Sequence, residues 1–170
     1  IEPLLSGGTG SVSHTEEVSS FLPDRFEPGT PNIPGILGLH AALCDLEQTD
    51  MGKLHQHELE LTQYFINGLM QMDPSESTLR AIGKHNTIER TSVVSVQTLQ
   101  TDMARVAYEM DDTYGIMTRV GLHCAPSAHK TLGTYPEGTI RFSFGPENTH
   151  HEVDLALHAL AEITGSPYHL

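Results

Sequence analysis

The stretch that decides the fold is Thr139-Ile140-Arg141-Phe142-Ser143-Phe144, near the C-terminal end of the printed sequence. Apolar and polar residues alternate along it, which is typical of a β-strand with one buried face. Successive side chains of a strand point to opposite faces, so the isoleucine and the two phenylalanines would share the buried face. Arg141 would then lie on the opposite face of the predicted sheet.

Helices and further strands are predicted on both sides of this strand. Thr149 and Glu152 form a capping box, which predicts a last helix to about residue 163. Hydrophobic periodicity predicts helices over 32–47, 51–72 and 99–112, a helical turn over 125–132, and strands over 79–83, 91–97 and 116–120. This alternation predicts an α/β (α+β) fold, in which helices cover one face of a small sheet.

The first part of the chain differs from the rest in composition. Residues 1–35 are dense in Gly, Pro, Ser and Thr, which favours loops over helices or strands. We therefore expect residues 1–50 to form a loop and helix segment, and residues 51–170 to form a small α/β domain. Because the chain opens with Ile1 directly before a Gly-rich stretch, we expect a fragment of a longer protein.

The overall charge excludes several classes of function. The formal net charge is −13 and there are only nine Lys and Arg, so we expect no nucleic-acid binding, which needs clustered basic residues. No apolar run is long enough to span a bilayer and no signal peptide is recognisable, so no membrane association is expected. Two Cys in a chain of 170 residues do not make a disulfide framework, which fits a reducing cytoplasm.

Cys124 is a candidate nucleophile. Gly121 and Pro126 flank it closely, which predicts a turn, and a thiolate on a turn can be stabilised by a nearby Arg or His. The alternative, an unreactive thiol, is equally compatible with the local sequence. A Cys–His hydrolase is disfavoured, because the adjacent His123 would point away from the thiol. Cys44 lies on the apolar side of a predicted helix, so we expect it to be a small buried core residue.

Arg141 is a candidate ligand for an anion. A guanidinium group is a natural clamp for a substrate carboxylate, although a solvated outer face of the sheet explains the pattern equally well. The glycine-rich stretches 7–11 and 29–32 could cradle a phosphate, but structural turns are the favoured interpretation. Although the chain has eleven His, none forms a His pair at i, i+4 and there is no CxxC, so no metal site is predicted.

Taken together, four stretches resemble a known family. They are Gly7-Gly8-Thr9-Gly10-Ser11, Arg25-Phe26-Glu27-Pro28-Gly29-Thr30-Pro31-Asn32, Arg119-Val120-Gly121-Leu122-His123-Cys124-Ala125, and Gly138-Thr139-Ile140-Arg141-Phe142-Ser143 with Asn148, Thr149 and Glu152. The chain thereby resembles the NifS-like class V aminotransferases, in particular the branch of cysteine desulfurases and selenocysteine lyases. The resemblance extends from residue 1 to about residue 163.

The resemblance implies a fold and a reaction. The fold would be the C-terminal small domain of a fold-type I pyridoxal phosphate enzyme, with a mainly antiparallel sheet. Pyridoxal 5'-phosphate would act as electron sink while Cys124 takes sulfur from cysteine as a persulfide, leaving alanine. Arg141 matches the clamp on the substrate carboxylate, and Arg119 and His123 flank the nucleophile as further substrate-binding candidates.

The resemblance also implies partners. The parent enzyme would be a homodimer that passes sulfur to an acceptor protein, for example in iron–sulfur cluster assembly. Gly29 and Thr30 match a loop that reaches the cofactor phosphate of the other subunit, and Gly8 and Thr9 match a loop at the same interface. Residues 1–50 would then belong to the large domain and the dimer interface.

The sequence departs from the family in one respect. The Schiff-base lysine of the family precedes the glycine-rich loop and is not in this chain, and Lys130 is interpreted as a surface loop residue. We therefore expect the chain alone to be inactive. Alternatives are a parent that acts on selenocysteine or cysteine sulfinate, and a non-catalytic sulfur-carrier or interaction domain.

Overall fold

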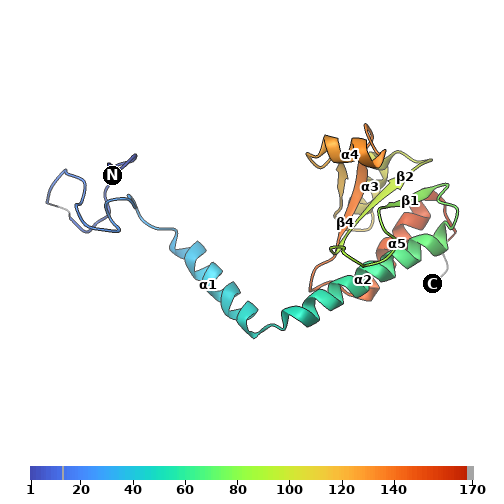
Figure 1. Ribbon diagram of the computed structural model, residues 1–170, viewed down its shortest axis with the longest axis horizontal. Helices are drawn as coiled ribbons and strands as arrows, with labels where there is room; N and C mark the ends of the chain where they lie inside the picture. The colour runs from blue at the N-terminus through green and yellow to red at the C-terminus, as the bar shows by residue number, and fades with distance from the viewer. Residues whose placement is uncertain (13, 168–170) are drawn as a thin grey trace. The chain divides into compact units, whose positions relative to one another are not determined.

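The chain divides after Thr49 into two units, Ile1–Thr49 and Asp50–Leu170, in the computed structural model (Figure 1). The structure describes residues 1–12 and 14–167. The last three residues of the predicted 51–170 domain therefore lie outside the described residues. Each unit is treated by itself below.

The first unit consists of a loop segment followed by one helix. No helix or strand occurs before Ile33 among residues 1–12 and 14–32. Helix α1 (Ile33–Gln48) begins after Asn32, whose side-chain oxygen accepts the N–H of Gly35 at 3.1 Å. Asn32 is thus the N-cap of α1, because this bond satisfies one of the N–H groups that the first turn leaves free.

The apolar side of α1 is not covered within its unit. Ile36, Leu39, Leu43 and Leu46 are 46–61% exposed, and no residue of the helix is buried. Cys44 is half-buried, with its Sγ 3.7 Å from Nδ1 of His40. The prediction that Cys44 is a buried core residue is wrong, because this helix makes no core in which it could be buried.

Two long helices pack together in the second unit. Helix α2 (Met51–Met72) begins after Asp50, whose Oδ1 accepts the N–H of Gly52 at 3.0 Å. Helix α5 (His150–Thr164) runs beside α2 and begins with the predicted capping box (Figure 1). At their contact a Cβ on Gly68 would lie 2.3 Å from Cδ1 of Leu157, so the absence of a side chain allows this close approach.

The sheet has four strands in the order β1-β2-β4-β3, and every neighbouring pair is antiparallel. The strands are β1 (Leu79–Ile82), β2 (Val93–Thr98), β3 (Arg119–Gly121) and β4 (Thr139–Ser143). Strand β4, the stretch from which the fold was predicted, pairs with β2 on one side and β3 on the other. The predicted small antiparallel sheet is therefore confirmed.

One face of the sheet packs against helices. Helix α2, helix α3 (Met103–Asp112) and helix α5 surround this core, in which the rings of Phe65 and Phe142 lie 4.8 Å apart. Ile140 and Phe142 are buried and Arg141 between them is half-buried, as the alternation predicts. Strand register places Arg119 and Arg141 opposite each other, on the face away from this core. The predicted α/β architecture with helices on one face is confirmed.

Two elements begin at least three residues later than the sequence predicts. Helix α3 begins at Met103 and not at residue 99, because Asp102 accepts the N–H of Arg105 at 2.8 Å and caps the helix there. Strand β3 begins at Arg119 and not at residue 116, because the N–H of Ile116 donates to the carbonyl of Met110 at 2.8 Å. That N–H completes the end of α3 and is not available to the sheet.

In the described part of the chain, none of the helices combines the length and apolar character needed to cross a bilayer.

Candidate functional site

Cys124 lies at the tip of a tight turn directly after β3. The N–H of Ala125 donates to the carbonyl of Leu122 at 2.8 Å and closes the turn. Its two central residues, His123 and Cys124, have φ of 49° and 58°. A side chain with Cβ rarely adopts this left-handed conformation, which costs about 1–2 kcal/mol per residue. The turn therefore presents an exposed, unpaired thiol on a strained backbone.

The base of this turn is held by close backbone contact with the start of β4. A Cβ on Gly138 would lie 2.3 Å from the carbonyl carbon and oxygen of Gly121, and Gly138 has φ of 84°. The side chain of His123 bonds the next residue along, with Nε2 3.2 Å from Oγ1 of Thr139. Gly138, directly before β4, and Thr139, the first residue of β4, thus hold the base of the turn.

His123 lies among positive groups. It is half-buried, and burial lowers the pKa of its imidazole, with the charge of Arg141 as the next cause and His129 and Arg119 adding to it. A hydrogen bond with the backbone of Thr139 acts in the opposite direction and raises the pKa, without reversing the shift. The surroundings therefore favour the neutral ring.

His129 completes this cluster from helix α4 (Pro126–Leu132). Its ring is buried, lies 5.8 Å from the ring of His123, and bonds Oγ1 of Thr134 through Nδ1 at 2.7 Å. His129 and Thr134 were not predicted as part of the site. The sequence shows only a histidine before Lys130, and its burial depends on how α4 folds back, which no local pattern reveals.

The two predicted arginines form a pair of like charges. Arg119 and Arg141 are direct cross-strand partners, an arrangement that is unfavourable in itself. The Nε atom of Arg141 is buried and has no hydrogen-bond partner in the described residues. Within the same residues neither arginine forms an ion pair. This face can therefore bind an anion without first breaking a salt bridge.

The structure thus brings four of the predicted site residues together in the second unit: Cys124, His123, Arg119 and Arg141. The other four, Gly8, Thr9, Gly29 and Thr30, lie in the first unit, where the N–H of Gly29 donates to the carbonyl of Gly8 at 2.9 Å. The two predicted glycine loops therefore lie side by side. Thr9 shares a hydrogen bond of 2.7 Å with Ser11, and Thr30 is exposed.

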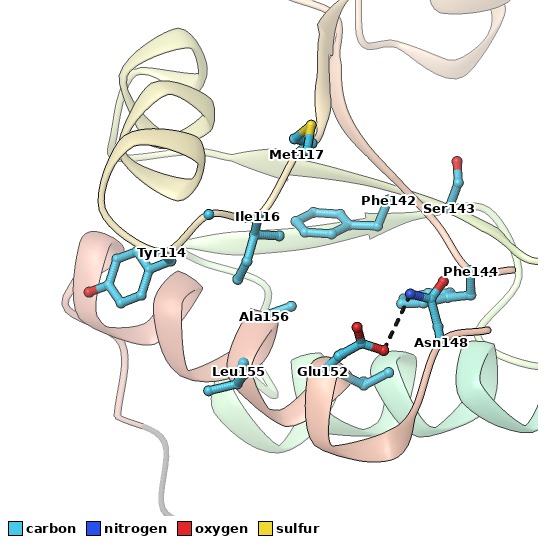
Figure 2. A pocket seen from close by; sticks show the side chains of 12 residues that line it. Tyr114, Ile116, Met117, Phe142, Ser143, Phe144, Asn148, Glu152, Leu155 and Ala156 are labelled. Atoms are coloured by element: carbon cyan, nitrogen blue, oxygen red, sulfur yellow. Dashed lines mark hydrogen bonds between the residues drawn. The ribbon is translucent and has the colours of Figure 1, made fainter.

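A separate cavity of about 310 Å³ lies on the core side of β4 (Figure 2). Ile116 and Phe142 form its inner wall, and Asn148 and Glu152, which share a hydrogen bond, lie at the start of α5. None of the eight predicted site residues lines it. Among residues 1–12 and 14–167, no group of three or more His, Cys, Asp or Glu side chains could hold a metal ion.

Comparison with known proteins gives the family. Residues 1–156 match the family described as aminotransferase class-V. The chain belongs to this family. A probable cysteine desulfurase from Staphylococcus epidermidis is 33% identical over 164 residues, which are 95% of this chain and 38% of that protein. A second, from Methanothermobacter thermautotrophicus, is 31% identical and covers 97% of this chain and 40% of its own length.

Solved structures of cysteine desulfurases give the same result. The apo structure of a cysteine desulfurase from Thermococcus onnurineus NA1 matches with a TM-score of 0.74 and 33% identity, over 96% of this chain and 39% of that one. A cysteine desulfurase from Escherichia coli in its S-sulfonic acid form matches with a TM-score of 0.65 and 26% identity, over 95% and 38%. The predicted family and the fold of a fold-type I enzyme are confirmed. The chain spans 38–40% of the length of these relatives.

Pyridoxal phosphate is the cofactor expected of class-V aminotransferases, and the glycine loops fit part of it. No neighbouring atom lies within 4 Å of a Cβ built on Gly8 or Gly29, so a phosphate could approach the backbone there. The hydroxyl groups of Thr9 and Thr30 could donate to its oxygens. A hollow of about 300 Å³ beside Thr9 fits less well, because Glu16 and Glu17 line it and would repel a phosphate.

No lysine of this chain fits the covalent attachment of such a cofactor. Lys53 and Lys84 are exposed and pair with Asp50 and Glu89. Lys130 is exposed too, with its Nζ 5.0 Å from the ring centre of Tyr135. The prediction that Lys130 lies on the surface is confirmed, but it lies on helix α4 and not in a loop.

Proposed function

We propose that this chain supplies the nucleophile and the carboxylate clamp of a cysteine desulfurase that depends on pyridoxal phosphate. One observation carries the proposal. The exposed thiol of Cys124 sits on a strained turn whose supporting strands place Arg119 and Arg141 opposite each other without carboxylate partners. Such a pair is suited to a substrate with a carboxylate next to its reactive sulfur.

Each residue has a distinct part in the proposed reaction. Arg141 binds the carboxylate of cysteine, and Arg119 adds positive charge at the same end of the site. The Cys124 thiolate then attacks the substrate sulfur. An S–S bond forms, and the C–S bond breaks with its electron pair on carbon, which takes a proton to give alanine. Pyridoxal phosphate, when bound, withdraws electrons from the carbon skeleton and so permits this cleavage.

The first unit would serve the cofactor in this enzyme. Gly8, Thr9, Gly29 and Thr30 would contact the phosphate at a homodimer interface, and residues 1–50 would belong to the large domain. Residues 51–170 would form the small domain that carries Cys124. The hydrogen bond between Gly29 and Gly8 supports the joint action of the two loops.

The persulfide on Cys124 requires an acceptor, so a sulfur-acceptor protein is part of the proposal, with iron–sulfur cluster assembly as the process it serves. The exposure of the thiol supports direct transfer. The two free thiols suit the reducing cytoplasm.

The first prediction concerns the nucleophile. In the full-length protein that contains this chain, Cys124→Ala should lower alanine formation from cysteine at least about 100-fold, because covalent catalysis is lost. The control Cys44→Ala should keep full activity, since that thiol lies on α1. Alanine and sulfide are measured with excess reductant. Undiminished turnover of cysteine by Cys124→Ala would show that Cys124 does not accept the sulfur.

The second prediction concerns the cofactor. The 170-residue chain mixed with pyridoxal phosphate should form no protein-bound chromophore and should not turn over cysteine, because each of its lysines is exposed and none lies at the proposed site. Visible absorption spectra after gel filtration test this. A bound chromophore that disappears in Lys130→Ala would contradict it.

A further inference from the structure

Positive charge gathers on the face of the sheet that lies opposite the core with α2, α3 and α5, although the chain as a whole is acidic. The formal net charge is −13, yet the strands contain Arg80, Arg119 and Arg141 and no Asp or Glu. Register places all three arginines on the face away from the core. Because no carboxylate of the strands neutralises them, the potential at this face is set by the arginines and by the groups packed between them.

His123 is the titratable group that this arrangement surrounds. The charges of Arg119 on β3, Arg141 on β4 and His129 on α4 act on its ring, and its hydrogen-bond partner Thr139 is uncharged. No carboxylate contributes to the electrostatics of its ring. The ring is also half-buried, so solvent screens these charges only in part.

We propose that His123, the residue directly before Cys124, takes up a proton when an anion binds Arg119 and Arg141. The role rests on the proposed function, in which the anion is the carboxylate of the substrate. In the empty site the arginines disfavour an imidazolium. A bound carboxylate offsets their charge, and the imidazolium becomes favourable.

The proton has a defined place on the ring. Nε2 lies 3.2 Å from Oγ1 of Thr139, so with the Nε2–H donated to that oxygen, Nδ1 is the nitrogen that is protonated. The proton comes from solvent, and no other bond forms or breaks. The consequence is timing, because the residue before the nucleophile would be an acid only while substrate is bound. The lowered pKa of His123 in the free protein supports this order of events.

The test is a titration of His123 by NMR in the 170-residue chain, which needs no cofactor. Its imidazole signal is identified by its absence in His123→Asn. Titrations are run in sodium acetate and in sodium chloride at equal ionic strength. Acetate should raise the pKa of His123 by about 0.5 or more relative to chloride, as expected for one opposite charge near a partly exposed group.

Substitutions separate charge from structure. Arg141→Gln should raise the pKa of His123 by a similar amount in chloride and should abolish the effect of acetate. Arg141→Lys, which keeps the charge, should leave the pKa low. The signals of the remaining histidines report whether each variant is folded. The acetate comparison on the unsubstituted chain stands if Arg141→Gln does not fold.

Equal pKa values of His123 in acetate and chloride would overturn the inference, as would an acetate effect of the same size on all histidines. An unchanged pKa in folded Arg141→Gln would overturn it too. These outcomes leave the proposed desulfurase function untouched, since that depends on turnover of cysteine and its loss in Cys124→Ala. Conversely, if the full-length protein did not turn over cysteine, the response of His123 to acetate would still be a valid result.

Discussion

At Gly138 two backbones approach so closely that no side chain fits between them. Its φ of 84° suits only glycine, and a Cβ would meet backbone atoms of Gly121 at 2.3 Å. Neither backbone can yield without moving β3 or β4. The turn that carries Cys124 is therefore supported by a residue that has no side chain.

Gly138→Ala should lower the free energy of unfolding by about 3 kcal/mol or more, because left-handed strain and the backbone clash add. Gly133→Ala is the matched control: Gly133 has φ of 68° but open space around its Cβ, so about 1 kcal/mol is expected. Urea unfolding measures both. Equal losses in the two variants would show that the contact with Gly121 adds nothing.

At this scale the sequence predicted the residues that carry chemistry but not those that support them. Cys124 and Arg141 could be predicted because they lie in recognisable motifs and because their side-chain types have few roles. His129 and Thr134 could not, since their mutual bond and their burial arise only when α4 packs against the turn.

Asp73 joins the end of α2 to the start of β1. Its Oδ2 accepts the N–H groups of Thr78 at 2.6 Å and Leu79 at 3.0 Å, and its Oδ1 accepts the hydroxyl of Ser75. Burial raises the pKa of this carboxyl. The hydrogen bonds from Leu79, Thr78, Ser75 and Ser77 together lower the pKa by more than burial raises it, so the resulting pKa lies well below the usual value. The ionised carboxylate thus stabilises the connection between the two elements.

The sign of the pH effect follows from this shift. Because the folded pKa of Asp73 lies below the unfolded value, its stabilisation is present above about pH 4 and is lost as the pH falls. Asp73→Asn should cost about 1–3 kcal/mol at pH 7 and reduce the loss of stability between neutral and acid pH. Thermal unfolding at several pH values tests this. Asp102→Asn, whose carboxylate is exposed and caps α3, is the control, with a smaller change.

Elements whose ends carry their own signals were predicted well, and the others were not. Asn32, Asp50 and Thr149 each cap a helix that begins within one residue of its predicted start, since a capping side chain acts within three residues of itself. The start of β3 was predicted wrongly, because the N–H of Ile116 has two possible partners and the end of α3 takes it. Such competition between elements is not encoded in any local pattern.

At the scale of the molecule, the core lies entirely within the second unit. Every buried hydrophobic side chain of the described residues falls between Leu61 and Ala161, and helix α1 contributes none. The sequence could not distinguish these cases, because the apolar residues of α1 and α2 recur with the same helical spacing. Only the partner that a helix face meets decides whether it is buried.

A chain that starts at Asp50 should therefore unfold cooperatively, with a midpoint within about 4 °C of the full chain, corresponding to a change of about 1 kcal/mol or less. Circular dichroism during heating measures this. Phe65→Ala in the shortened chain should lower its stability by about 3–5 kcal/mol, since that ring is fully buried. A shortened chain that lacks a cooperative transition would show that residues 1–49 contribute to its core.

The two left-handed residues at the tip of the nucleophile turn have a consequence for how this chain evolves. Glycine at positions 123 and 124 would relieve their strain, so selection for stability alone would replace both residues. In a laboratory lineage that drifts under selection for folding but without selection for sulfur transfer, these two positions should change to glycine or asparagine early. The thiol and the imidazole thus occupy positions where they lower the stability of the fold. The rate at which they are replaced would measure how strongly selection for function maintains them.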